Sequence, residues 1–260
     1  MNANKVSFNG TAISYYGEGQ GEPVVLIHGF CGSKDYWSKV IPALAEEYHV
    51  IAVDLPGHGE SGLPMEDTSI EKMAEALNDA IQELGVEKVS LFGHSLGGYV
   101  TLAFAEAFAD KLQKFALVHS TANPDSEEGK KGREVAAGKI DKEGIKPFVD
   151  GLIPNLFAPG EDHQEEMQIA KEIGYGTNPE GAKAALKAMK QRPDRNQVLK
   201  NTELPVLLIA GEKDQIIPPE KSFTVDRTNI QQVTIKGAGH MSMYEAPGEL
   251  VEIIRGFMKK

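Results

Sequence analysis

The sequence has a single cysteine, Cys31, in 260 residues. A lone cysteine excludes an internal disulfide and any zinc site built from cysteine thiolates. No apolar run approaches the roughly 20 residues that a membrane-spanning helix needs. The first residues show no basic segment followed by an apolar stretch, so we expect no signal peptide. These absences predict a cytoplasmic protein without a membrane partner.

Basic residues are outnumbered: 27 Lys and Arg stand against 38 Asp and Glu, for a formal net charge of −11 at pH 7. Nucleic acids are bound by surfaces rich in Lys and Arg, so we expect no nucleic-acid partner. The 41% hydrophobic and 25% charged content is ordinary for a globular protein. A chain of this length can bury a full core.

Apolar runs without polar alternation recur along the chain, as in strands buried on both faces of a parallel sheet. The predicted strands are Pro23–Gly29, His49–Gly57, Lys88–Ser95, Phe115–Thr121, Pro205–Asp214 and Gln231–His240. A hairpin with its turn at Asn9-Gly10 is expected before them. Helical periodicity in residues 68–85 and in a closing segment from Pro247 predicts helices between and after the strands. Thr68 and Glu71 fit a capping box, and Gly85 stands where a helix C′ residue would.

Strands that alternate with helices predict an α/β fold with a mostly parallel sheet. Residues 122–201 break this alternation, because they contain no convincing strand and two stretches compatible with helices. So long a segment is not a loop in a compact domain. We therefore predict one domain, 1–260, whose core comprises 1–121 and 202–260 and whose helical cap is the insertion 122–201.

The segment Gly93-His94-Ser95-Leu96-Gly97 fits G-x-S-x-G between a predicted strand and a predicted helix. Such a tight turn would hold Ser95 at positive φ, with its hydroxyl beyond the sheet edge. The flanking Gly93 and Gly97 leave room for crowded backbone. The alternative is a chance pentapeptide or a Gly-Ser turn that caps a helix.

A serine hydroxyl needs a base, and the base needs an orienting group. His240 follows the last predicted strand on a Gly-rich loop, and Asp214 follows the strand before it. The order Ser95, Asp214, His240 is that of one hydrolase architecture. Glu212 is the alternative carboxylate, and Asp214 alone is also explained as a turn former.

An oxyanion hole needs two backbone N–H groups. We assign them to Leu96 and Phe30, with Cys31 as a one-residue alternative to Phe30. The candidates for lining the pocket are His28, Cys31, His94, His119 and Met241. Arg192 and Arg195 either anchor an acidic substrate or form a solvated charge run, and we favour the solvated run. No metal or organic cofactor is expected.

Five segments together resemble the motifs of the α/β-hydrolase fold family: HGFCGS, DLPGHGES, GHSLGG, GEKDQIIP and GAGHMSMYEAP. The resemblance covers nearly the whole chain. It implies an eight-stranded, mostly parallel sheet with a helical cap inserted after strand six, and a Ser-Asp-His triad. Ser95 speaks against the haloalkane dehalogenase and epoxide hydrolase branches, whose nucleophile is Asp. The short HGFCGS loop is similar to that of capped esterases for small substrates.

The expected function is therefore that of a serine carboxylesterase, which cleaves small carboxylic esters through an acyl-enzyme. The same triad also serves carbon–carbon bond hydrolases, acyltransferases and cofactor-free perhydrolases, because one fold hosts many chemistries. A protein of another class, a ligand sensor with slow turnover, is the remaining alternative.

Overall fold

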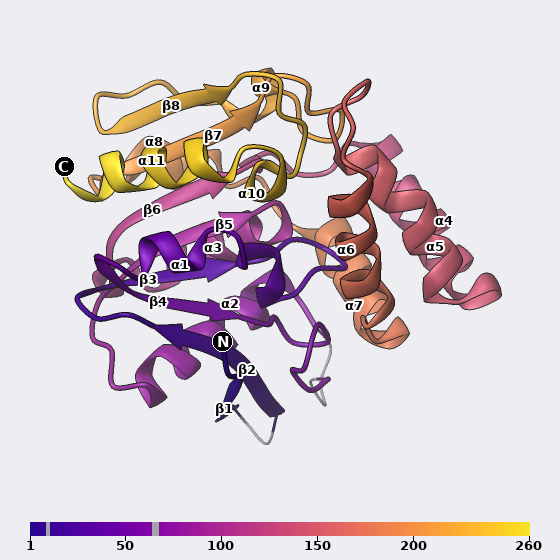
Figure 1. The fold of residues 1–260 in the computed structure, drawn as a ribbon, viewed down its shortest axis with the longest axis horizontal. Helices are drawn as coiled ribbons and strands as arrows, with labels where there is room; N and C mark the ends of the chain where they lie inside the picture. The colour runs from indigo at the N-terminus through magenta and orange to yellow at the C-terminus, as the bar shows by residue number, and fades with distance from the viewer. Residues whose placement is uncertain (9–10, 64–67) are drawn as a thin grey trace.

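The computed structural model describes residues 1–8, 11–63 and 68–260. An eight-stranded sheet runs through it in the order β1-β2-β4-β3-β5-β6-β7-β8 (Figure 1). The strands are β1 (Asn4–Phe8), β2 (Thr11–Glu18), β3 (Glu22–Ile27), β4 (Tyr48–Val53), β5 (Val89–His94), β6 (Leu112–Val118), β7 (Val206–Gly211) and β8 (Ile230–Ile235). β2 is antiparallel to β1 and β4, and all other neighbouring strands are parallel.

All predicted strands are present, and each observed strand ends before the turn residues that its predicted segment included. β5 and β7 are buried along their whole length, whereas β8, at the sheet edge, is buried only at its two end residues. This difference follows from position, because only the inner strands are covered on both faces. The predicted hairpin strands pair, and their turn at Asn9-Gly10 lies outside the described residues.

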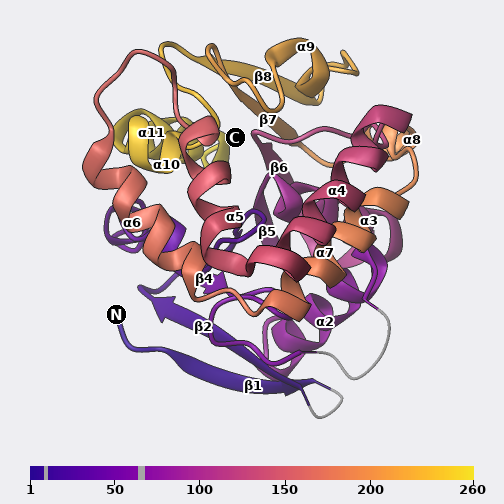
Figure 2. The same ribbon diagram turned by 90° about the vertical axis from the view of Figure 1, so that its right-hand side faces the viewer.

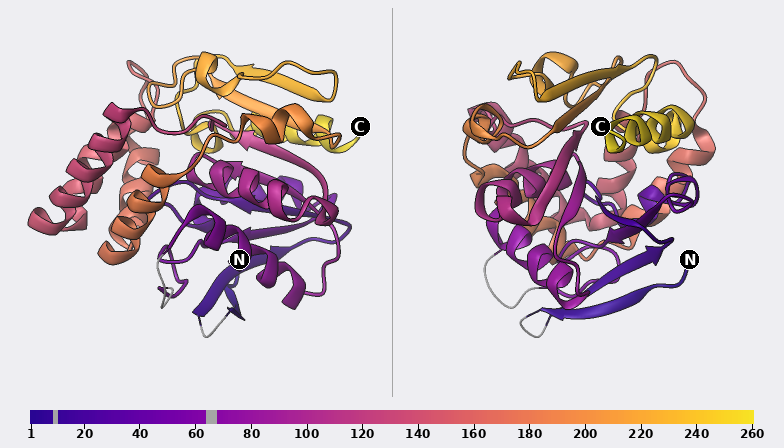
Figure 3. Two further views of the ribbon diagram at one scale, coloured as in Figure 1. Left: turned by 180° about the vertical axis from the view of Figure 1, so that it is seen from behind. Right: turned by 90° about the vertical axis from the view of Figure 1, so that its left-hand side faces the viewer.

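Helices cover both faces of the sheet (Figures 1 and 3). On one face lie α1 (Ile41–Leu44), α10 (Ser242–Glu245) and α11 (Pro247–Met258), and on the other α2 (Ile70–Glu83), α3 (Leu96–Ala107) and α8 (Asn196–Asn201). The short elements η1 (Lys34–Trp37), η2 (Ala109–Lys111), η3 (Ile153–Leu156) and α9 (Pro219–Ser222) lie in the connections. Among the described helices, none is both long and apolar enough to cross a membrane.

The start of α2 corrects one prediction. Ser69, not Thr68, is the N-cap residue: its backbone is extended and its hydroxyl accepts a hydrogen bond from the Lys72 N–H at 3.1 Å. The predicted N-cap is therefore wrong by one residue, and Lys72 rather than Glu71 stands at the N3 position, so the capping box is not formed. The helix end is as predicted, with Gly85 at φ +70° where a side chain would be strained.

Between β6 and β7 the chain, which is fully described there, forms helices and no strand. Four of these helices gather at one end of the sheet (Figures 1 and 2): α4 (Glu127–Glu143), α5 (Ile145–Leu152), α6 (Gln164–Tyr175) and α7 (Pro179–Gln191). The predicted helical cap after strand six is thus confirmed. The Arg195 N–H donates to the Ala122 carbonyl at 2.9 Å, so the two ends of this segment lie side by side.

Candidate active site

Ser95 occupies the turn between β5 and α3 at φ 51°, ψ −112°. A Cβ on Gly93 would collide with the Gly97 carbonyl, and one on Gly97 would lie 2.6 Å from the Ile27 carbonyl oxygen. Side chains at these two positions would therefore force the turn open. The positive φ and the need for both glycines are as the motif predicted.

Asp214 follows β7 and contacts His240, which follows β8. His240 Nδ1 and Asp214 Oδ2 are 2.7 Å apart, and both side chains are buried. The other oxygen, Oδ1, accepts hydrogen bonds from the Ile216 and Ile217 N–H groups at 2.8 and 2.9 Å. Because the carboxylate is fixed by its own turn, it holds His240 with Nδ1 protonated and leaves Nε2 as the basic atom.

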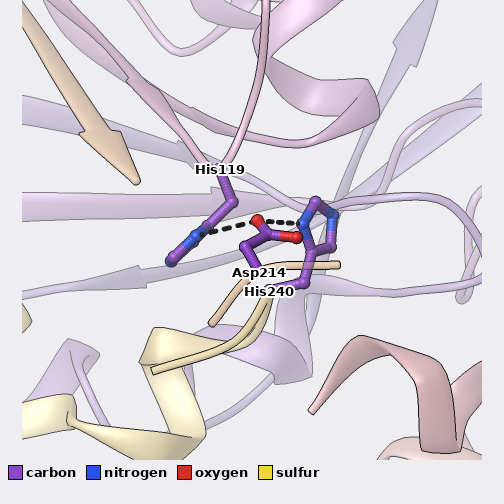
Figure 4. A group of neighbouring side chains, drawn as sticks. All are labelled: His119, Asp214 and His240. Atoms are coloured by element: carbon purple, nitrogen blue, oxygen red, sulfur yellow. Dashed lines mark hydrogen bonds and ion pairs between the residues drawn. The ribbon is translucent and has the colours of Figure 1, made fainter. Parts of the chain in front are cut away.

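A second imidazole faces the same carboxylate (Figure 4). His119, which follows β6 at φ 48°, has Nδ1 3.4 Å from Asp214 Oδ2 and Nε2 2.7 Å from Ser242 Oγ. Burial by itself would raise the pKa of Asp214, but the charge of His240 and the polar contacts from both imidazoles hold that pKa well below its ordinary value. Asp214 is therefore an ionised carboxylate at neutral pH.

Ser95 and His240 line one cavity of about 460 Å³ between the sheet edge and the cap. Its other lining residues are Phe30, His94, Tyr99, Thr121, Asn123, Pro124, Asp125, Ser126, Gly129, Arg133, Leu152, Leu156, Met189, Arg192, Ile216, Ile217 and Lys221. Asp214 stands behind His240 and is not part of the lining. The predicted nucleophile and base thus share one concave site, with the predicted acid behind the base.

Of the two predicted oxyanion donors, Leu96 directly follows Ser95 and Phe30 lines the same cavity. Leu96 is the first residue of α3, so its N–H has no acceptor one turn earlier in the helix. Phe30 lines the cavity, and its loop passes close to the nucleophile: a Cβ on Gly29 would lie 3.2 Å from Ser95 Cβ. The Cys31 alternative is fully buried in this loop at φ 54°, whereas Phe30 is partly buried, and the Cys31 carbonyl accepts the Tyr36 hydroxyl at 3.3 Å.

Of the residues predicted to line the pocket, His94 does so. Four others do not line it and are fully buried elsewhere: His28, Cys31, His119 and Met241. His28 shows the physical reason: its Nε2 accepts the Leu55 N–H at 2.9 Å and its Nδ1 contacts the Gly29 carbonyl at 2.7 Å. It braces two loops against each other instead of facing the cavity.

His94 supports the base. Its Nε2 lies 2.9 Å from the His240 carbonyl, which can only accept, so Nε2 carries the hydrogen. Burial first, and then the neighbouring His240 and His119, lower the pKa of His94 well below its ordinary value. The imidazole is therefore neutral, and it ties the backbone of the base to the nucleophile turn.

One feature of the site, the role of Glu245, was not predicted from the sequence. The Glu245 side chain, 2% exposed, accepts hydrogen bonds from the N–H groups of Gly239 and Met241, which flank His240, and of Ala158 in the cap. An acid within the GAGHMSMYEAP loop was the available signal. Glu212, the alternative carboxylate to Asp214, is exposed and accepts the Gly237 N–H at 2.9 Å, so it serves a turn.

The expectation of a solvated charge run at Arg192 and Arg195 is wrong, because the two residues are 7% and 3% exposed. Arg195 pairs with Glu71 and Glu106 on the core helices, outside the cavity. Arg192 lines the cavity, where its guanidinium lies 4.0 Å from the Tyr99 ring centroid. Both arginines are buried because the cap packs their side chains against α2 and α3.

His119, Asp214 and His240 also have the spacing of a metal site: their ligand atoms lie within 4.8 Å of one another. However, His240 Nδ1 and Asp214 Oδ2 already contact each other at 2.7 Å. This contact is the one expected if Asp214 orients His240 as a base.

Residues 22–202 match the family described as the alpha/beta hydrolase fold. A dihydrolipoyllysine-residue acetyltransferase component of an acetoin cleaving system, from Pseudomonas putida, is 30% identical over 94% of this chain, which spans 65% of that protein. A malate-bound thermophilic esterase from Thermogutta terrifontis superposes with a TM-score of 0.93 and 32% identity, over 100% of this chain and 98% of that one. An enol-lactonase from Burkholderia xenovorans LB400, at 22% identity, superposes with a TM-score of 0.90 over 99% and 100% of the two chains.

Proposed function

We propose that this chain, which belongs to the α/β-hydrolase fold family, is a serine hydrolase that cleaves small carboxylic esters. The observation that carries the proposal is the shared cavity, in which Ser95 on its strained turn faces the same space as His240. The similar esterase at 32% identity supports ester chemistry. The cavity volume of about 460 Å³ suits a small substrate.

In the proposed mechanism, His240 Nε2 takes the proton of the Ser95 hydroxyl while Oγ attacks the ester carbonyl. Asp214 holds Nδ1 protonated, and its negative charge stabilises the imidazolium that forms. Because Asp214 stays ionised, this stabilisation is present throughout the neutral pH range.

The tetrahedral intermediate carries a negative charge on the former carbonyl oxygen. The N–H groups of Leu96 and Phe30 are the proposed donors to it, and the N-terminal end of α3 adds the positive end of its helix dipole. His240 then gives its proton to the leaving alcohol, so that an acyl-enzyme on Ser95 remains.

Deacylation repeats these steps with water. His240 takes a proton from water, the hydroxide attacks the acyl carbon, and the acid product leaves as Ser95 recovers its proton. The whole cycle uses the side chains and amides already named.

Ser95→Ala tests this proposal. With p-nitrophenyl butyrate, kcat should fall by on the order of 10⁶, as when a triad nucleophile is removed. Ser69→Ala, which removes only the N-cap of α2 outside the cavity, is the control and should leave kcat unchanged. Turnover that persists in Ser95→Ala would exclude Ser95 as the nucleophile.

Acyl transfer is a second candidate, favoured by the acetyltransferase name of the Pseudomonas putida relative. The acyl-enzyme would then be intercepted by an alcohol or thiol instead of water. Adding a small thiol or alcohol to the ester assay and separating the products distinguishes the two. Free acid as the dominant product supports hydrolysis, and a dominant transfer product supports the transferase.

A further inference from the structure

The cavity that Ser95 lines carries more positive than negative charge on its lining residues. Among its lining residues are the cations Arg133 on α4, Arg192 after α7 and Lys221 on α9, against a single carboxylate, Asp125. This is unexpected in a chain whose formal net charge is −11. A positive pocket in an acidic protein concentrates anionic ligands.

Asp125 is shared between two of these cations. Its Oδ1 lies 2.7 Å from Arg192 Nη1 and its Oδ2 lies 3.1 Å from Arg133 Nε. One carboxylate thus offsets only one of two guanidinium charges. Burial opposes ionisation of Asp125, but the two arginines lower its pKa below the ordinary value, so it does carry its charge.

Arg192 has a buried donor that the described part of the protein leaves without a hydrogen-bond partner. Its side chain is 5% exposed, and Nη1 donates to Asp125 and to the Met189 carbonyl at 2.8 Å. Its Nε is buried and has no acceptor among the described residues. A buried donor without a partner is costly, so an acceptor supplied by a ligand would relieve it.

Lys221 also lines the cavity, as an exposed residue, and no carboxylate of the described residues pairs with it. Arg195 provides the contrast three residues after Arg192: it is also buried, lies outside the cavity and pairs with both Glu71 and Glu106. The buried arginine outside the cavity is therefore paired with two carboxylates, whereas Arg192 in the cavity shares one carboxylate with Arg133.

The position of this excess matches a substrate held at Ser95. Tyr99, whose ring stacks on the Arg192 guanidinium, lies one helical turn after Ser95 on α3, about 6 Å along the axis. An ester carbonyl at Ser95 would thus leave the far end of a short chain beside Arg192.

We propose that the preferred substrates are esters that carry a carboxylate, bound by Arg192 with Arg133 and Lys221 while the ester carbonyl lies at Ser95. The inference rests on the proposed function and specifies its substrate class. Arginine suits this role because its fork of N–H groups binds a carboxylate in a fixed orientation.

Matched pairs of esters test the proposal. Monomethyl succinate, glutarate and adipate are compared with methyl butyrate, pentanoate and hexanoate, in which a methyl group replaces the carboxylate. O-Butyryl glycolate and ethyl butyrate form the pair with the carboxylate on the alcohol side. We expect kcat/KM to be about 10- to 100-fold higher for the charged member of at least one pair, the gain typical of a hydrogen bond to a charged group. The pair that shows this difference identifies whether the carboxylate is bound on the acyl side or the alcohol side of the ester.

Arg192→Gln keeps much of the side-chain volume and removes the charge. It should lower kcat/KM for the preferred charged ester by about 10- to 100-fold and for its neutral partner by less than about threefold. Arg133→Gln should act in the same direction and serves if Arg192→Gln does not fold. Arg195→Gln is the control from the same segment, and should leave the charged-to-neutral ratio unchanged.

A ratio near one in the wild-type protein, or equal losses on both esters in Arg192→Gln, would overturn the charged subsite. Hydrolysis of the neutral esters that depends on Ser95 would at the same time leave the proposed function intact. Conversely, glutarate binding can be measured by calorimetry in Ser95→Ala, where no turnover is needed. Binding that weakens with added salt and in Ser95→Ala/Arg192→Gln supports the subsite even if Ser95 proves not to be the nucleophile.

Discussion

The two carboxylate oxygens of Asp214 make different contacts. Oδ1 is held by the amides of its own turn, and Oδ2 faces His240 on one side and His119 on the other. The carboxylate therefore cannot rotate without breaking contacts on both sides. This fixed geometry is what determines the tautomer of His240.

Replacing Asp214 by Asn tests that role. The amide would leave His240 in the wrong tautomer, so kcat for p-nitrophenyl butyrate should fall on the order of 10⁴. Glu212→Gln, at the exposed carboxylate two residues earlier, is the matched control and should change kcat little. A normal rate in Asp214→Asn together with a large loss in Glu212→Gln would assign the acid to Glu212.

Glu245 accepts hydrogen bonds from the backbone N–H groups on either side of His240. An amide in its place would turn NH₂ towards the N–H groups of Gly239, Met241 or Ala158, and at least one buried donor would lose its acceptor. We expect Glu245→Gln to lower the free energy of unfolding by about 1–3 kcal/mol and to reduce kcat. Chemical denaturation compares it with Glu249→Gln, at an exposed position of α11. Equal stability of the two variants would contradict this role.

At the scale of elements, the turn at Ser95 needs glycine because a side chain there would collide with neighbouring backbone. A glycine with open space around it provides the comparison. In Gly97→Ala the new Cβ would meet the Ile27 carbonyl oxygen at 2.6 Å, so we expect loss of stability and of activity. Gly132, within α4, has nothing within 4 Å of such a Cβ. Gly132→Ala should therefore stabilise the protein by about 0.5–1 kcal/mol, the usual gain for a helix interior.

Thermal unfolding and the ester assay measure both variants. If Gly97→Ala kept full activity and stability, the turn would be less constrained than its packing indicates. If Gly132→Ala were destabilising, this would contradict the expectation that glycine weakens the interior of α4.

An element could be predicted from the sequence where residues close together in the chain determine its structure. Strands such as β5 and β7 were predicted because a strand that is buried on both faces consists of consecutive apolar residues. The Ser95 turn was predicted because sterics at Gly93 and Gly97 leave few residue choices. The N-cap of α2 was missed by one residue, since Thr68 and Ser69 carry equivalent hydroxyl groups and only backbone direction selects between them.

The site was predictable only in part for a related reason. Ser95, Asp214 and His240 follow parallel strands, whose ends meet at one sheet edge, so their convergence follows from topology. By contrast, Arg192 and Arg195 became buried through the packing of the cap on the core, which no local pattern encodes. His119 was expected at the pocket mouth, but its positive φ turns it towards Asp214 and Ser242 instead.

At the scale of the whole molecule, buried histidines make stability depend on pH. Burial, the dominant cause for both, lowers the pKa of His28 from 6.5 to about 4 and of His58 to about 3. Above pH 6.5 both are neutral whether the chain is folded or unfolded. As pH falls below 6.5, the unfolded chain binds protons that the folded protein does not, so stability is lost. At pH 5 the loss is roughly 2 kcal/mol for each residue.

Urea denaturation at pH 7.5 and pH 5 measures this loss. The wild-type protein should be less stable at pH 5, and His28→Gln, which removes one titrating group, should show a smaller difference between the two conditions. Equal wild-type stability at both pH values, or greater stability at pH 5, would contradict the buried, neutral state of these imidazoles.

The proposed mechanism requires Ser95 to be an activated nucleophile that forms a covalent intermediate. Mass spectrometry of the protein after reaction with a fluorophosphonate, an irreversible analogue of the acyl donor, tests this most directly. We predict one adduct per chain, located on the peptide that contains Ser95, and very slow labelling in His240→Ala. An adduct on another residue, or an unmodified Ser95 in protein that actively hydrolyses esters, would contradict it.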